Sequence, residues 1–217
     1  MKLLAIFAAA SLTGVFPLID HAPKFQFAGS DQLAFQITQG AHADIFAAAS
    51  PKYPEQLWSQ GLCSKPTVFA TNTVVLIVPR ANPARINSVS DLQRDGIKLV
   101  IGAKGVPIGD YTRKLLANLG LQSALKNVVS EEDDVKLVVT KVALGEADAG
   151  FVYLTDVKPV GNKVFRIAIP ASAQPTVQYE LCIPTTTKHP KLAAAFVREV
   201  LSRRGRATLR TAGFGLP

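Results

Sequence analysis

Few of the residues that build metal and catalytic sites occur in this sequence. Among 217 residues there are two cysteines and three histidines, with one methionine and one tryptophan. Neither the cysteines nor the histidines have partners at the spacing of a metal site or of a nucleophile–base pair. The Gly-x-Ser-x-Gly elbow and the Gly-x-Gly-x-x-Gly fingerprint are also missing. These absences predict that the protein is not an enzyme and carries no cofactor.

The two cysteines, Cys63 and Cys182, leave two alternatives open. They form one disulfide in an oxidising compartment, or they remain two buried thiols. The sequence favours neither alternative.

No apolar run reaches the ~18 residues that would indicate a membrane span. The composition, 48% hydrophobic and 18% charged, is that of a globular protein with one large domain or two small ones. The net charge is +8, which suits nucleic acid, an anionic membrane or a small anion. The basic residues are scattered, and the one dense cluster, Arg203 to Arg206, is interpreted as a solvated helix end. We therefore expect no nucleic-acid partner.

The N-terminus has two interpretations. Met1 and Lys2, followed by an apolar run and three alanines, resemble a short signal peptide. The rival is a buried first strand, Lys2–Ala9, which leads to an N-cap serine at Ser11. We favour the strand because its removal would take the first element from an α/β fold. The export signal is then expected to be absent from this chain or already removed.

Strand-like and helix-like segments alternate along the chain, which predicts parallel or mixed sheets covered by helices. The expected strands are Lys2–Ala9, Lys24–Ala28, Asp44–Ala48, Thr73–Pro79, Lys98–Gly102, Ala149–Tyr153, Lys163–Ile169 and Gln178–Pro184. The expected helices are Asp31–Gln39, Tyr53–Gln60, Ser90–Arg94, Tyr111–Leu119, Val135–Leu144 and His189–Ala207. We expect Gln178–Pro184 to pair with Thr73–Pro79.

Two serines follow strand-like runs that end in small residues. Ser11 and Ser30 each stand where an amphipathic segment begins, as N-cap residues do. Two further helix starts follow glycines at Gly102 to Gly109 and the acidic run Glu131 to Asp134, whose side chains are expected to face water. Helix N-termini carry free N–H donors and the positive end of the macrodipole. The pattern predicts that several helix N-termini converge on one small anion.

Short motifs spread over nearly the whole chain resemble the molybdate-binding proteins of ABC importers, a family of periplasmic-type solute-binding proteins. Each motif is weak alone, but together and in this order they are specific. They are Phe7–Leu12, Phe27–Ser30, Gly40–Phe46, Ala70–Thr73, Val106–Tyr111, Asp134–Val135 and Gly145–Asp156.

The resemblance implies an α/β, two-lobe periplasmic-binding-protein (Venus-flytrap) fold, with mixed sheets flanked by helices and the ligand in the cleft between the lobes. Lobe one is expected at residues 1–81 and 175–217, and lobe two at residues 82–174. By resemblance, five residues bind molybdate: the hydroxyls and N–H groups of Ser11 and Ser30, the main-chain N–H groups of Ile108 and Val135, and the hydroxyl of Tyr153. Molybdenum is then present only as the bound oxyanion.

The implied function is capture of molybdate or tungstate in the periplasm or otherwise outside the cytoplasmic membrane, and delivery to a membrane ABC permease. The protein is expected to act as a monomer. Two alternatives stay open: a binding protein for sulfate or phosphate, and the oxyanion-sensing domain of a regulator.

Two features depart from the family pattern. The interval from Ser11 to Ser30 is short, so the first helix is expected to be truncated or replaced by the loop around Pro17. Ile108 stands where a smaller residue is common, which puts the volume of the pocket in doubt.

Overall fold

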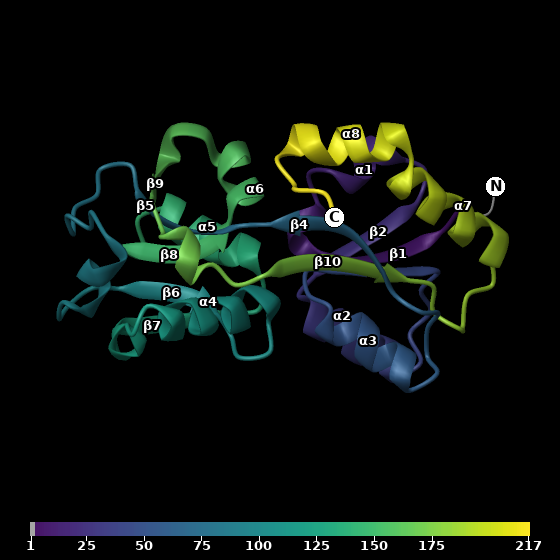
Figure 1. Cartoon of the computed structure of the whole chain (residues 1–217), viewed down its shortest axis with the longest axis horizontal. Helices are drawn as coiled ribbons and strands as arrows, with labels where there is room; N and C mark the ends of the chain where they lie inside the picture. Colours follow the sequence, from purple (N-terminus) through teal and green to yellow (C-terminus); the bar gives the residue numbers. More distant parts are fainter. Residues whose placement is uncertain (1–2) are drawn as a thin grey trace. The chain divides into compact units, whose positions relative to one another are not determined.

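Two mixed β-sheets of five strands each organise the chain, and each sheet belongs to its own compact unit. The computed structural model describes residues 3–217. Unit 1 combines the residues up to Asn72 with Val177–Pro217, and unit 2 is Thr73–Thr176 (Figure 1). Met1 and Lys2, the first residue of the predicted strand Lys2–Ala9, lie outside the described residues.

The sheet of unit 1 has the order β2-β1-β3-β10-β4. Its strands are β1 (Ala5–Ala9), β2 (Lys24–Ala28), β3 (Ile45–Ala48), β4 (Thr67–Asn72) and β10 (Val177–Cys182). Strand β1 runs parallel to both β2 and β3, whereas β10 is antiparallel to β3 and β4. The predicted first strand is therefore confirmed from Ala5 to Ala9, whereas Leu3 and Leu4 precede it.

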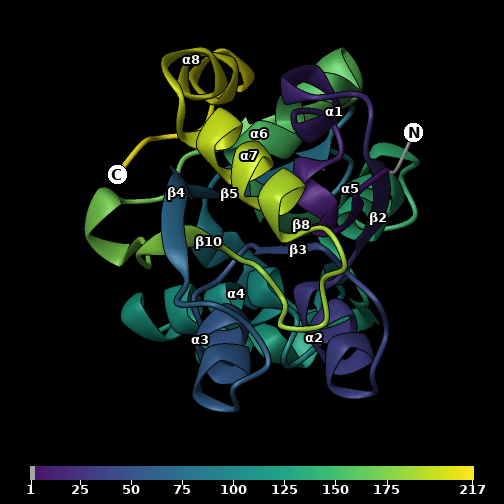
Figure 2. The same ribbon diagram turned by 90° about the vertical axis from the view of Figure 1, so that its right-hand side faces the viewer.

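Helices cover both faces of this sheet (Figures 1 and 2). They are α1 (Phe16–Ile19), α2 (Ser30–Thr38), α3 (Lys52–Ser59), α7 (Pro190–Leu201) and α8 (Arg203–Ala212). Helices α2 and α3 lie on one face, over a buried cluster that includes Leu33, Phe46 and Leu57. On the same face Cys63 and Cys182 form a disulfide with a Cα–Cα distance of 6.0 Å, which settles the alternatives left open above.

The sheet of unit 2 has the order β7-β6-β8-β5-β9. Its strands are β5 (Val74–Pro79), β6 (Leu99–Gly102), β7 (Val128–Glu132), β8 (Ala149–Tyr153) and β9 (Val164–Ile167). Strand β6 is parallel to β7 and β8, and β5 is antiparallel to β8 and β9. The helices are α4 (Pro107–Asn118), α5 (Val135–Ala143) and α6 (Leu154–Val157).

The predicted pairing of Gln178–Pro184 with Thr73–Pro79 is wrong. Strand β10 pairs with β3 and β4, and β5 lies in the other sheet between β8 and β9. The cause is β4, which the sequence reading missed and which takes the place beside β10. The chain passes into unit 2 at Thr73, so the stretch 73–81, expected in lobe one, belongs to unit 2 by contacts.

The predicted last helix, His189–Ala207, is in fact two helices. Helix α7 ends at Leu201, and the Ser202 hydroxyl accepts a hydrogen bond from Gly205 N at 3.0 Å to cap α8. Because Ser202 caps α8, the chain can turn between the two helices while a first-turn N–H group of α8 keeps a hydrogen-bond partner. Within residues 3–217, none of the helices is both long and apolar enough to cross a membrane.

Strand β10 carries a buried acid. Glu180 is 7% exposed and lies opposite Ala48 of β3 and Val68 of β4. Its Oε2 has no hydrogen-bond partner among the described residues. Burial, with a smaller contribution from the Glu55 carboxylate on α3, raises the pKa of Glu180 to about 7 from 4.5.

We expect Glu180→Gln to remove a pH-dependent loss of stability. The folded protein holds this proton up to about pH 7, whereas the unfolded chain releases it near pH 4.5, so stability falls as the pH rises between these values. At pH 8 the free energy of unfolding of the variant should exceed that of the parent by ~1–3 kcal/mol, which raises its melting temperature by several degrees. At pH 4.5 the two proteins should melt at the same temperature.

Melting curves from pH 4 to pH 8 measure this difference, with the exposed Glu146→Gln as the matched control. Parallel curves for parent and Glu180→Gln across the whole range would contradict the assignment.

Candidate functional site

Serines mark the carboxyl ends of three neighbouring strands in unit 1. Because β1 is parallel to β2 and β3, with Ala9 opposite Ala28 and Ala8 opposite Ala47, the three strands end at one edge. Two residues beyond these ends stand Ser11, Ser30 and Ser50, all buried. Ligands of open α/β sheets bind outside the carboxyl ends of the strands. This edge is the candidate half-site of unit 1.

The predicted capping role of the two serines is wrong. Ser11 lies inside the short 3-10 helix Ala10–Leu12, and Ser30 is the first residue of α2, after Gly29 as N-cap. The N-cap residues of the two helices, Ala9 and Gly29, have no side chain that could accept a hydrogen bond from the first turn. The Ser30 hydroxyl instead accepts from Ala49 N at 3.1 Å, which ties the start of α2 to the end of β3.

Ser11 is held from the far end of the sequence. Its Oγ lies 2.9 Å from the hydroxyl of Tyr179 on β10, in a buried hydrogen bond that either group can donate. Asn72 at the end of β4 donates to the same Tyr179 hydroxyl at 3.4 Å. The sequence reading missed both residues, because nothing local in the sequence marks a contact across this separation. The short connection after Ser11 is as expected, with α1 only four residues long around Pro17.

Ser50 was also missed, although the sequence carries a signal for it. The hexapeptide Ile-Phe-Ala-Ala-Ala-Ser occurs at both 6–11 and 45–50. The two copies lie side by side in register, with Ile6 opposite Ile45 and Phe7 opposite Phe46. The Ser50 hydroxyl accepts from Lys52 N at 3.2 Å.

Unit 2 has an equivalent edge. Strands β6, β7 and β8 are parallel, and Gly102 lies opposite Glu132 at their carboxyl ends. Ile108 is in the first turn of α4, Val135 is the first residue of α5, and Tyr153 is the last residue of β8. The structure therefore brings these three predicted residues to one edge in unit 2, as it brings Ser11 and Ser30 to one edge in unit 1.

Two glycines allow α4 to begin directly against β6. A Cβ at Gly109 would collide with the carbonyl oxygens of Gly102 and Ala103, and one at Gly102 would lie 2.7 Å from Gly109 N. The contact is between backbones, so a side chain at Gly109 has no flexible neighbour to displace. These glycines thus set the position of the first turn of α4, which contains Ile108.

The acidic run is mostly paired. Glu131 bonds Arg113 at 2.6 Å, and Glu132 bonds Lys141 at 2.6 Å. Asp134 caps α5, because its Oδ1 accepts from Lys136 N at 2.7 Å and Leu137 N at 3.1 Å. The expectation that all these side chains face water is wrong for Glu132, which is 7% exposed.

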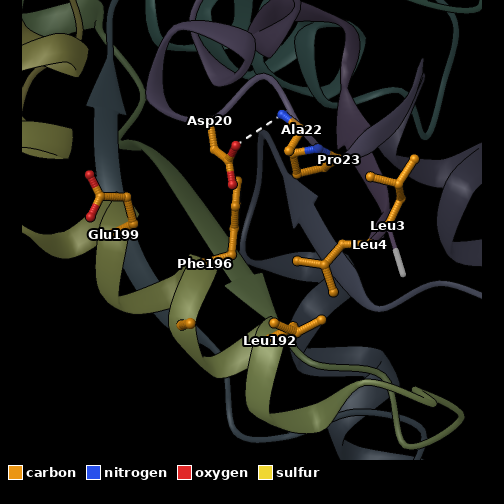
Figure 3. Close-up of a pocket in the computed structure, with 9 residues that line it drawn as sticks. Leu3, Leu4, Asp20, Ala22, Pro23, Leu192, Phe196 and Glu199 are labelled. Atoms are coloured by element: carbon orange, nitrogen blue, oxygen red, sulfur yellow. Dashed lines mark hydrogen bonds between the residues drawn. The ribbon is translucent and has the colours of Figure 1, made fainter. Parts of the chain in front are cut away.

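A cavity of about 330 Å³ lies elsewhere in unit 1 (Figure 3). Leu4, Phe196 and Leu192 surround it, with the carboxylates of Asp20 and Glu199 at its side. Leu4 precedes β1, so the cavity lies at the amino end of that strand, whereas Ser11 follows its carboxyl end. It is separate from the half-site. In the part of the chain that the structure describes, no cluster of three or more His, Cys, Asp or Glu side chains could hold a metal ion.

Comparisons with known proteins agree with the resemblance to solute-binding proteins that the sequence motifs indicate. The family described as bacterial extracellular solute-binding protein matches residues 3–215. The molybdate-binding protein ModA of Mycobacterium tuberculosis is 39% identical over 99% of this chain and 85% of its own length. That of Haemophilus influenzae is 35% identical over 82% of this chain and 76% of its own length.

Solved structures share the fold. The periplasmic molybdate-binding protein of Azotobacter vinelandii matches with a TM-score of 0.86 at 23% identity, over 99% of each chain. The sulfate-binding protein SubI of Mycobacterium tuberculosis matches with 0.81 at 16% identity, over 99% of this chain and 86% of that one. The predicted fold class is thereby confirmed.

We expect Gly109→Ala to destabilise unit 2 by ~2 kcal/mol or more, because the added methyl group overlaps fixed backbone atoms. Denaturant unfolding of the ligand-free protein measures the loss. Gly14→Ala is the control, since a Cβ at Gly14 has nothing within 4 Å, and it should change stability by less than ~0.5 kcal/mol. Equal midpoints for the two variants would contradict the close packing of α4 on β6.

Proposed function

Because the chain belongs to the family of bacterial extracellular solute-binding proteins, we propose that it captures molybdate or tungstate outside the cytoplasmic membrane and delivers it to an ABC permease. The observation that carries this proposal is the 39% identity to a molybdate-binding protein over 99% of the chain. The polar strand edges of the two units supply the chemistry. No bond is made or broken, and the oxyanion is cargo, not a cofactor.

Neutral donors suffice for such a ligand. A buried dianion is costly unless each oxygen receives a hydrogen bond. Helix first turns offer N–H groups that have no partner within their own helix, together with the positive end of the macrodipole. Ile108 and Val135 stand in such first turns.

The hydroxyls complete the proposed donor set. The Ser30 oxygen accepts from Ala49 N, so its proton is left to donate to an anion. The Ser11 hydroxyl can do the same when Tyr179 donates in their shared hydrogen bond. With Tyr153, these residues are the five proposed ligand contacts. We further propose that units 1 and 2 are the two lobes of the binding protein and that it acts as a monomer without nucleic acid.

We propose molybdate as the ligand, and not sulfate or phosphate, because of the identities of the named relatives. The relatives named for molybdate are 39% and 35% identical to the chain, whereas the sulfate-binding SubI is 16% identical and shares the fold alone.

Thermal melts with molybdate, tungstate, sulfate and phosphate test the substrate class. A ligand at about 100 times its dissociation constant stabilises the native state by about 2.7 kcal/mol, which raises the melting temperature by several degrees. We expect this rise with molybdate and tungstate only. A rise with sulfate or phosphate alone would keep the fold and overturn the substrate.

Ser30→Ala should weaken molybdate binding at least ~10-fold, because one ligand oxygen loses a donor in a buried place. Calorimetric titration measures the affinity, and the apo melting temperature should fall by only a few degrees from loss of the bond to Ala49 N. The exposed Ser59→Ala on α3 is the control. If Ser30→Ala binds as tightly as the parent, Ser30 does not contact the ligand.

A further inference from the structure

One buried carboxylate in unit 2 bonds the backbone of one proposed ligand residue, Tyr153, and the side chain of Lys136, the neighbour of another, Val135. Asp156 of α6 is 1% exposed. Its Oδ1 accepts from Lys136 Nζ at 2.7 Å, and its Oδ2 accepts from Tyr153 N at 3.3 Å. Asp156 therefore bonds both to the first turn of α5 and to the last residue of β8.

The start of α5 is fixed at a second point. Asp134 Oδ1 accepts from the backbone N–H of Lys136 and of Leu137, so the residues on both sides of Val135 are restrained. Through Lys136 and Asp156, the Val135 N–H is linked to Tyr153 by only two side chains. A change in that link would alter the spacing between two donors meant for one ligand.

Burial of the Asp156 carboxylate costs free energy, because the charged group loses its hydration. Burial raises the pKa of Asp156, and the Asp134 carboxylate adds to this, while Lys136 and the Tyr153 N–H oppose it. A buried ion pair contributes little net stability compared with apolar residues of the same volume, although removal of one partner is damaging. Such a pair has its clearest use where geometry must be held.

We propose that the Lys136–Asp156 ion pair is the positioning element of the unit 2 half-site, which holds the Val135 N–H and Tyr153 at the spacing that a tetrahedral dianion requires. This inference rests on the function proposed above. Lys136 and Asp156 are positioning residues, because they act through Val135 and Tyr153.

The same helix provides a matched comparison. Lys141 Nζ bonds Glu132 Oε1 at 2.6 Å, and the side chains of that pair are 33% and 8% exposed, against 34% and 0% for Lys136 and Asp156. The Lys141–Glu132 pair ties α5 to β7 and bonds none of the proposed ligand residues. The two pairs therefore share chemistry and near-equal burial, and differ in what they hold.

A rival explanation is that Lys136 attracts the anion by its charge alone. Asp156→Asn separates the two. If charge alone matters, loss of a negative group beside the half-site should tighten molybdate binding. If positioning matters, the same substitution should weaken it, because the Lys136 tether is lost.

The test is calorimetric titration of molybdate into the full chain for the parent and for Lys136→Met, Asp156→Asn, Lys141→Met and Glu132→Gln. We expect Lys136→Met and Asp156→Asn each to weaken binding tenfold or more. The variant that carries both Lys136→Met and Asp156→Asn should bind molybdate about as tightly as the single variant with the lower affinity, because both substitutions break the same link. Lys141→Met and Glu132→Gln should change affinity less than twofold, and Lys136→Arg should recover most of the loss.

Circular dichroism and apo melting curves accompany each titration, and only folded variants are compared. If Asp156→Asn does not fold, Lys136→Met is compared with Lys141→Met, which removes the same charge from the same helix, and equal losses of affinity would overturn the positioning role. Tighter binding by Asp156→Asn, or equal losses for the two ion pairs, would overturn the positioning role while the proposed function stands. No binding of molybdate by the parent would overturn the proposed function, and this inference with it.

Discussion

Parallel pairing of neighbouring strands is the constraint on which the rest of the molecule depends. Parallel strands point the same way, so whatever follows each of them emerges at a common edge. In unit 1 this places Ser11, Ser30 and Ser50 together, and in unit 2 it places the starts of α4 and α5 beside Tyr153. A sheet with alternating strand directions would send these same residues to opposite edges.

The common edge alone does not fix the positions of the hydrogen-bond donors. Close backbone packing and buried hydrogen bonds also position them. Gly109 lets α4 start in contact with β6, and Asp134 fixes the first turn of α5. In unit 1, Tyr179 holds the Ser11 hydroxyl and Ala49 N holds that of Ser30. The groups proposed to meet an anion are therefore arranged before any ligand arrives, which lowers the ordering cost of binding.

Local patterns in the sequence were enough to predict most of the alternating elements, though not β4 or β7, and to place Ser11 and Ser30 just beyond the ends of strands. They could not assign Thr73–Pro79 to a sheet, because an all-apolar strand fits the centre of either one. Nor could they show that Ser11 contacts Tyr179, since that contact depends on the placement of β10. The capping interpretation failed because a serine before a helix looks the same whether its hydroxyl serves its own helix or a neighbouring strand. The repeated hexapeptide did carry information on Ser50, in that identical segments here became paired neighbours.

The Cys63–Cys182 disulfide joins the two separate stretches of sequence from which unit 1 is built. All of unit 2 lies in the covalent loop that this bond closes, so unit 2 is topologically an insertion into a cross-linked host. A protease that nicks any bond of unit 2 would leave the fragments covalently attached under oxidising conditions. Unit 1 would also keep its two stretches tethered while unit 2 opens. The cross-link lowers the entropy cost of bringing these two stretches together again in one sheet. Outside the cytoplasmic membrane, where disulfides persist, this connectivity keeps a damaged chain in one piece.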